Sequence, residues 1–121
     1  MPELPEVQTV VNHIKRDLMG EKLRSIIPLW DKVLHNFSPS DIHKELNGKV
    51  IIDVYRRAKF IILQFNGRII AIHLRMTGKL YISLDSGHPK HCTAFIEFNS
   101  GKKLVFEDVR KFGRFYLYND L

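Results

Sequence analysis

The N-terminal heptapeptide MPELPEV places a proline and a carboxylate directly behind the initiator methionine. If Met1 is removed, Pro2 becomes a secondary amine, a class of group whose reference pKa of about 8 leaves part of it neutral near pH 7. Such an amine attacks an aldehydic sugar carbon to form an iminium ion, which acidifies the neighbouring carbon for elimination. Glu3 could move protons to or from the sugar. The alternative is structural, with Pro2 only permitting removal of Met1 and Pro5 starting a helix.

Two motifs in the middle of the chain carry side chains that suit a nucleic acid. In RRAKF, Lys59 stands between apolar neighbours at a strand junction, where it either snorkels to water or presents its ammonium to a phosphate. In HLRMTGKL, Met76 is expected at a strand tip, where a flexible apolar side chain can wedge between bases instead of filling the core. His73 of the same motif is either a structural histidine in the core or at a sheet edge, or a residue that contacts a ligand.

The motif DVRKFGR is the most suggestive of the set. Arg110 and Phe112 alternate, so on an extended segment they point the same way, and Lys111 and Arg114 add charge around them. A guanidinium can donate to an orphaned base while the ring stacks on its neighbour. The alternative is an ordinary hairpin with solvated cations and Phe112 in the core.

Composition bounds the class of protein. A chain of 121 residues forms one domain, and its net charge of +6 attracts polyanions, nucleic acid first, unless it is only a solubilising surface. The single cysteine, Cys92, excludes an internal disulfide and suits a reducing cytosol. With His88 and His91 it falls short of a zinc pattern, so we expect a solvated loop there. No apolar run approaches the roughly 20 residues of a membrane span, which predicts a cytoplasmic protein.

The element pattern predicts helices flanking a β-domain. Apolar spacings of three and four after Pro5 predict a first helix that stops before Gly20, and Ser38-Pro39 predict a second over 38–48. Runs rich in Ile, Val and Phe predict strands, with turns at Asn66-Gly67 and 99–101. The strands are expected over 22–30, 49–57, 59–65, 68–75, 78–84, 93–98, 103–108 and 113–118. The expected fold is mostly β with flanking helices: an N-terminal helix plus an antiparallel β-sandwich, as a single domain over 1–121.

Taken in order, MPELPEV, RRAKF, HLRMTGKL and DVRKFGR resemble the N-terminal domain of formamidopyrimidine-DNA glycosylase, over essentially the whole chain. The resemblance implies that Pro2 is the nucleophile, Glu3 its general acid/base partner and Lys59 a lysine of the catalytic site that contacts phosphate near the lesion. It also implies five DNA-binding residues. They are His73 on the DNA backbone, the trio Met76, Arg110 and Phe112 that fills the gap left by a flipped base, and Lys111.

The activity that the resemblance implies is DNA repair. Oxidised purines such as 8-oxoguanine and formamidopyrimidines would be excised from double-stranded DNA through a Schiff base on the N-terminal proline, followed by strand cleavage by β,δ-elimination. The protein is expected to be a monomer of the bacterial cytosol. The family continues into a helix-two-turns-helix module and a zinc finger beyond residue 121, so no cofactor is expected in this chain, and the isolated domain is expected to be weak or inactive.

Two departures and two alternatives accompany the resemblance. Val109 stands where the family usually has proline, and Lys111 where it commonly has arginine. One alternative is a basic β-domain that binds nucleic acid without chemistry. The other is the endonuclease VIII branch, which prefers oxidised pyrimidines. That branch is disfavoured because it usually opens with PEGPE and lacks the Met/Arg/Phe trio.

Overall fold

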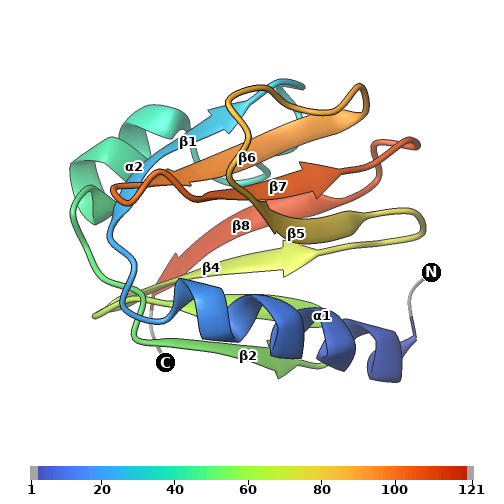
Figure 1. Ribbon diagram of the computed structural model, residues 1–121, viewed down its shortest axis with the longest axis horizontal. Helices are drawn as coiled ribbons and strands as arrows, with labels where there is room; N and C mark the ends of the chain where they lie inside the picture. The colour runs from blue at the N-terminus through green and yellow to red at the C-terminus, as the bar shows by residue number, and fades with distance from the viewer. Residues whose placement is uncertain (1–2, 120–121) are drawn as a thin grey trace.

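The computed structural model describes residues 3–119 and contains two helices and eight strands (Figure 1). Their order is α1 (Leu4–Leu18), β1 (Leu23–Pro28), α2 (Pro39–Leu46), β2 (Asp53–Arg57), β3 (Phe60–Gln64), β4 (Arg68–His73), β5 (Lys79–Ser83), β6 (Cys92–Phe98), β7 (Lys103–Glu107) and β8 (Arg114–Asn119). Within the described residues, neither helix has the length and apolar character needed to cross a membrane.

The strands form two four-stranded sheets, in the orders β1-β6-β7-β5 and β2-β3-β4-β8. Every strand pair is antiparallel. The predicted turns are present, and Gly67 and Gly101 there adopt φ values of 85° and 98°, which glycine reaches without steric cost. The predicted fold, an N-terminal helix with an antiparallel β-sandwich, is confirmed.

Helix α1 closes one open side of the sandwich. Its residues Val7, Val11, Ile14 and Leu18 are buried, as their helical spacing predicts. The helix packs against β2 and β5, which are edge strands of the two different sheets, so its apolar stripe covers the gap between them (Figure 1). It begins one residue earlier than Pro5, because a proline in the first turn needs no backbone donor there.

Helix α2 and the segment before it cover other edges. Ser38 and Asp41 form a capping box, in which Ser38 N donates to Asp41 Oδ2 at 2.8 Å, and the helix packs beside β1. The preceding segment joins the edge of β8: Leu34 forms a parallel bridge with Phe115, and His35 N donates to Phe115 O at 2.8 Å. Residues 33–36 are therefore fixed beside β8, while Leu29 N and Trp30 N donate to Thr93 O of β6, although the sequence predicts no regular structure for most of this segment.

Three local expectations are wrong. DVRKFGR is not extended: Lys111 has a φ of 58° and the motif forms a turn between β7 and β8. Lys59 does not lie in a core stretch but in the β2–β3 turn, where Ala58 has a φ of 54°. Cys92 is not part of a solvated loop, because it is buried at the start of β6. In each case the sheet pairing decides where a strand ends, and the local composition does not report that pairing.

Candidate nucleic-acid interface at one end of the sandwich

The strand register brings three of the sequence motifs to one end of the sandwich. Arg57 pairs with Phe60, Phe60 with His73, and His73 with Arg114. Because paired residues of neighbouring strands lie side by side, the β2–β3 turn, the β4–β5 loop and the β7–β8 turn share this end. Figure 1 shows these connections at the end of the molecule where α1 begins.

The start of α1 belongs to the same end. Arg56 Nε of β2 donates to Gln8 Oε1 in the first half of α1 at 3.3 Å. Glu3 is the N-cap residue of the helix, yet its side chain makes no capping hydrogen bond and is exposed. Its carboxylate is thus exposed at the end of the sandwich that carries the three connections. Pro2 lies outside the described residues.

The β2–β3 turn presents Lys59 beside an aromatic contact. Arg56 Nη1 donates to Ala58 O at 2.9 Å and closes the turn, while Lys59 is half-buried. The next residue, Phe60, meets the His73 ring edge-on at a centroid distance of 5.0 Å. Lys59 and His73 are therefore neighbours at this end of the sheet.

His73 is poised as a neutral hydrogen-bond donor. Burial, followed by the positive charges of Arg75 and Lys59, lowers its pKa below the ordinary value of 6.5. Its Nδ1 accepts a hydrogen bond from Arg75 N at 3.0 Å. An acceptor Nδ1 requires the proton on Nε2, so the neutral ring can donate from Nε2 to an oxygen of a ligand.

The candidate wedge residues are exposed at the tips of two loops. Met76 is 48% exposed and Phe112 44% exposed, so neither side chain fills the core and both are accessible to a base, as a base-stacking role requires. The Arg110 guanidinium lies 5.0 Å from the centroid of the Phe112 ring. Arg110 and Phe112 therefore meet through the geometry of a turn, although the extended alternation that suggested their pairing is absent.

A buried carboxylate ties the two loops together. Asp108 is 1% exposed, and its Oδ1 accepts from Thr77 Oγ1 at 2.5 Å while its Oδ2 accepts from Gly113 N at 2.7 Å. Arg110 N also points to Thr77 Oγ1, at 3.4 Å. Asp108 and Thr77 are not among the functional residues predicted from the sequence. The available signal was the acidic residue that opens DVRKFGR ahead of Arg110 and Lys111.

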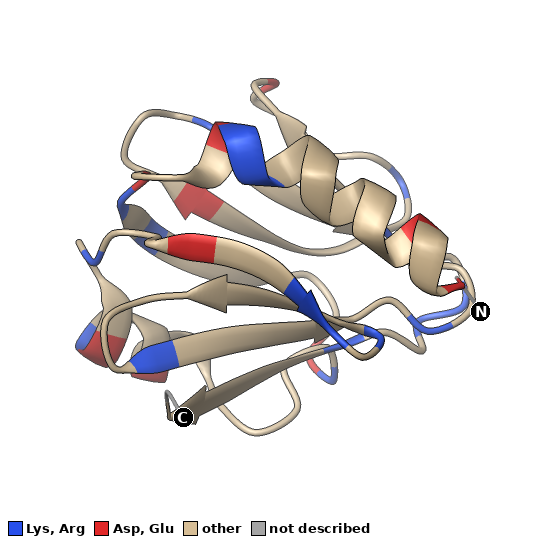
Figure 2. Cartoon of the chain, turned by 90° about the horizontal axis from the view of Figure 1, so that it is seen from below, with Lys and Arg blue, Asp and Glu red and all other residues tan. Residues whose placement is uncertain are grey.

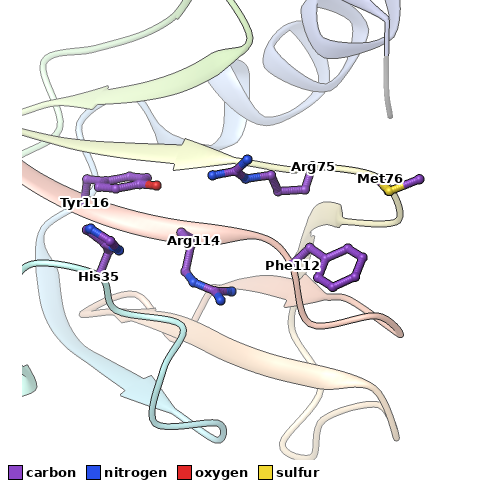
Figure 3. A pocket seen from close by; sticks show the side chains of 6 residues that line it. All are labelled: His35, Arg75, Met76, Phe112, Arg114 and Tyr116. Carbon is purple, nitrogen blue, oxygen red and sulfur yellow. The ribbon is translucent and has the colours of Figure 1, made fainter.

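The two loops border an open hollow of about 560 Å³, shown in Figure 3. Its lining residues are His35, Arg75, Met76, Phe112, Arg114 and Tyr116. The sequence analysis did not single out His35, Arg75 or Tyr116, because the hollow is assembled from the 29–36 segment, the β4–β5 loop and β8. No carboxylate lines it.

Cations outnumber carboxylates on the loops at this end, where Lys59, Arg75, Arg110 and Lys111 accompany the buried Asp108, while Glu3 is exposed at the start of α1. Figure 2 shows Lys and Arg segments on the loops near the start of α1. Three ion pairs occur among residues 3–119, namely Lys15–Asp53, Arg68–Glu45 and Lys102–Glu21, and none involves a cation of the loops described above. In the same residues no three His, Cys, Asp or Glu side chains gather in a way that could hold a metal ion. The arrangement suits an anionic ligand with flat apolar parts.

Comparisons with known proteins agree with the fold. The model of the formamidopyrimidine-DNA glycosylase N-terminal domain matches residues 1–115. A formamidopyrimidine-DNA glycosylase of Mycoplasma genitalium is 37% identical over 124 residues, covering 100% of this chain and 44% of that protein. One of Streptococcus pneumoniae is 37% identical over 114 residues, covering 93% of this chain and 41% of that protein.

Solved structures of the Lactococcus lactis enzyme Fpg (MutM) superpose closely. Its complex with DNA that contains N7-benzyl-Fapy-dG is 34% identical, has a TM-score of 0.88, and covers 98% of this chain and 44% of that chain. Its complex with abasic-site DNA is 33% identical with the same TM-score and coverage. The chain therefore has the fold of the N-terminal half of a DNA glycosylase: two sheets closed by a helix, with basic and apolar side chains on the loops at one end. The chain belongs to the formamidopyrimidine-DNA glycosylase family, and it spans less than half the length of the curated relatives it matches.

Proposed function

We propose that this chain is the catalytic domain of a DNA glycosylase and abasic-site lyase that removes oxidised purines from double-stranded DNA. The observation that carries the proposal is the convergence of four separated motifs on one end of the sandwich. The Lactococcus lactis structures, in complex with Fapy-dG and abasic-site DNA, support the same substrate class. No such convergence is needed for a merely solubilising surface.

The chemistry would begin at the amine of Pro2 once Met1 is removed. The amine attacks C1′ of the damaged nucleotide, the N–C1′ bond forms, and the glycosidic bond breaks as the base leaves with a proton. Glu3, exposed at the start of α1, would supply and withdraw protons at the sugar. The attacking nitrogen loses its proton, and the sugar ring opens as the C1′–O4′ bond breaks and O4′ takes a proton, which leaves an iminium ion between the proline nitrogen and C1′. The iminium ion acidifies C2′, so that loss of a C2′ proton eliminates the 3′ phosphate and, in a second elimination, the 5′ phosphate leaves. Lys59 would hold a phosphate beside the lesion.

The wedge residues would stabilise DNA from which a base has been flipped. Met76 would occupy the void, since its unbranched thioether conforms to irregular space. Phe112 would stack on the neighbouring base, a contact for which about 1–3 kcal/mol is typical. Arg110 would donate to the acceptors of the orphaned cytosine. His73 Nε2 and Lys111 would contact backbone phosphates.

Borohydride trapping on a duplex with one abasic site tests the nucleophile. With Met1 shown to be removed by mass spectrometry, we expect a reduced cross-link whose peptide maps to Pro2, because only an amine forms a reducible Schiff base. Pro2→Gly should trap at least about tenfold more slowly, since it lacks the ring-constrained secondary amine. Trapping through a lysine at an undiminished rate in Pro2→Gly would contradict the assignment.

Glu3→Gln separates catalysis from binding. The change keeps size and polarity but removes proton transfer, so base excision from an 8-oxoguanine duplex should fall by about a hundredfold or more while DNA affinity stays within about twofold. Full excision by this variant would assign the proton transfer to another group. If the wild-type chain binds DNA but neither traps nor excises, the non-catalytic binding domain is the correct reading.

A further inference from the structure

The hollow beside the wedge contains an arginine that the proposed chemistry does not use. Arg114 stands at the first position of β8, with its guanidinium carbon 4.8 Å from the centroid of the Trp30 ring. Its Nη1 donates to Lys111 O and to Gly113 O, both at 2.9 Å. The guanidinium is thus stacked on an indole and tied to two carbonyls, which fixes its plane and leaves its other N–H groups for a ligand.

Apart from Phe112, the aromatic rings at or beside the hollow are already packed against other side chains. Lys111 Nζ lies 5.9 Å from the Trp30 centroid, so two cations share that indole. The Tyr116 ring packs against His35 at 4.9 Å and against Tyr118 at 5.9 Å. The two charged side chains that line the hollow, Arg75 and Arg114, are both cations, and the ligand they suit is an anion.

The position of Arg114 relative to Phe112 indicates which anion. The two residues are separated only by Gly113, and Figure 3 shows both side chains on the wall of the same hollow, with Arg75 opposite. A DNA strand whose base stacks on Phe112 carries its sugar–phosphate backbone past that wall. Neither Arg75 nor Arg114 has a carboxylate partner in the part of the chain that the structure describes.

We propose that Arg114, held on Trp30, binds a backbone phosphate of the DNA strand on which Phe112 stacks. This inference rests on the proposed function. It adds a contact that positions the strand opposite the damaged nucleotide, made by Arg114 at the end of DVRKFGR and supported by Trp30, which lies outside the four motifs. Trp30 is a positioning residue here, because it acts through the guanidinium it supports.

The test compares Arg114→Gln with Arg24→Gln, an exposed arginine of β1 whose carbonyl accepts a hydrogen bond from Asn47 just after α2, away from the hollow. Both variants remove one charge. Fluorescence anisotropy on an abasic-analogue duplex should show about tenfold weaker binding for Arg114→Gln. Its log–log salt slope should be shallower by about 0.9, the share of one phosphate. Arg24→Gln should change both quantities less. Equal effects of the two variants would overturn the inference while leaving the proposed function intact.

Methylphosphonate substitution locates the phosphate. In the borohydride assay, Arg114→Gln should raise the DNA concentration for half-maximal trapping about tenfold without lowering the maximal rate. One neutral methylphosphonate in the undamaged strand, next to the orphaned base, should raise the DNA concentration for half-maximal trapping by wild type as much as Arg114→Gln does. The same methylphosphonate should cause no further increase for Arg114→Gln. Additive losses at every position of that strand would overturn the assignment. A wild-type chain that binds but never traps would instead overturn the proposed catalysis, and the anisotropy comparison would still decide the role of Arg114.

Two substitutions at Trp30 test whether the indole ring supports the Arg114 guanidinium. Trp30→Phe keeps a ring under the guanidinium and should bind like wild type. Trp30→Leu keeps bulk but loses the π face, and it should weaken DNA binding by about threefold to fivefold, the loss of a cation–π contact. Thermal unfolding of each variant reports folding independently. Unchanged binding by a folded Trp30→Leu would show that the indole does not position Arg114.

Discussion

His73 joins a local structural role to the proposed DNA contact. Its Nδ1 accepts from Arg75 N, and this bond helps to hold the β4–β5 loop in a conformation where Arg75 has a φ of 58°. A non-glycine residue at positive φ is strained, so the loop needs such local support. The neutral ring serves both the loop and a possible phosphate oxygen, while protonation of Nδ1 would break the loop contact.

At the residue scale we predict a pH-dependent stability that depends on His73. Burial, followed by the charges of Arg75 and Lys59, lowers the pKa of His73 below 6.5. The unfolded chain therefore takes up this proton at a higher pH than the folded chain, and the free energy of unfolding falls as the pH drops from 7 to 5. Denaturant titrations between pH 7 and 5 should show that the free energy of unfolding of His73→Gln declines less with falling pH than that of wild type.

The control is His13→Gln, which alters an exposed position of α1. It should follow the wild-type decline. Identical pH profiles for His73→Gln and wild type would contradict the prediction.

At the element scale, the two wedge loops act as one unit because they share Asp108 and rest on Phe106. A Cβ added at Gly113 would overlap the Phe106 ring, and one added at Gly78 would overlap both Phe106 and the Leu74 backbone. Phe106 is fully buried in β7. The glycines thus allow the loops to approach the core closely enough for Asp108 to reach both of them.

We predict that Gly113→Ala destabilises the domain by about 1–3 kcal/mol, the cost typical of overpacking. It should also weaken DNA binding, because the displaced backbone carries the neighbouring Phe112 with it. Chemical denaturation and anisotropy measure the two effects.

Gly87→Ala is the matched control, since nothing lies within 4 Å of the Cβ it would add. Its stability should stay within about 0.5 kcal/mol of wild type. Equal free energies of unfolding for Gly113→Ala and Gly87→Ala would contradict the prediction, because the loops would then accommodate the Cβ at position 113 without losing stability.

At the scale of the whole molecule, the net charge of +6 and the mainly basic loops at one end of the sandwich predict weak, salt-dependent DNA binding by the 121-residue chain. Each neutralised phosphate adds about −0.9 to the slope of log affinity against log salt on duplex DNA. The longer relatives have more than twice this length, so this chain offers only part of the surface that theirs can bring to a duplex. We expect lower affinity and lower lesion selectivity than for a full-length relative.

Anisotropy titrations at several KCl concentrations, on damaged and undamaged duplexes, measure both quantities. A full-length relative such as the Lactococcus lactis enzyme serves as the reference. Tight, lesion-selective and salt-insensitive binding by the 121-residue chain would contradict the prediction and indicate that this domain suffices for recognition.

The sequence by itself determined the elements and most of the motif residues. Helix α1 follows from apolar spacing, α2 from its Ser38-Pro39 start, and the hairpin turns from Asn66-Gly67 and Gly101, because each depends on neighbours along the chain. The exposed pair Met76 and Phe112 was also anticipated from motif context.

Only the tertiary structure decided how these parts meet. The pairing of His73 with Arg114, the Asp108 link between two loops and the hollow that includes His35 all join residues distant in sequence. Local patterns do not encode such register, because a strand's composition is compatible with several partners and strand ends. For the same reason DVRKFGR looks extended in sequence and is a turn in the fold: the buried carboxylate of Asp108 accepts from Gly113 N and closes it, and that burial exists only once both sheets have formed.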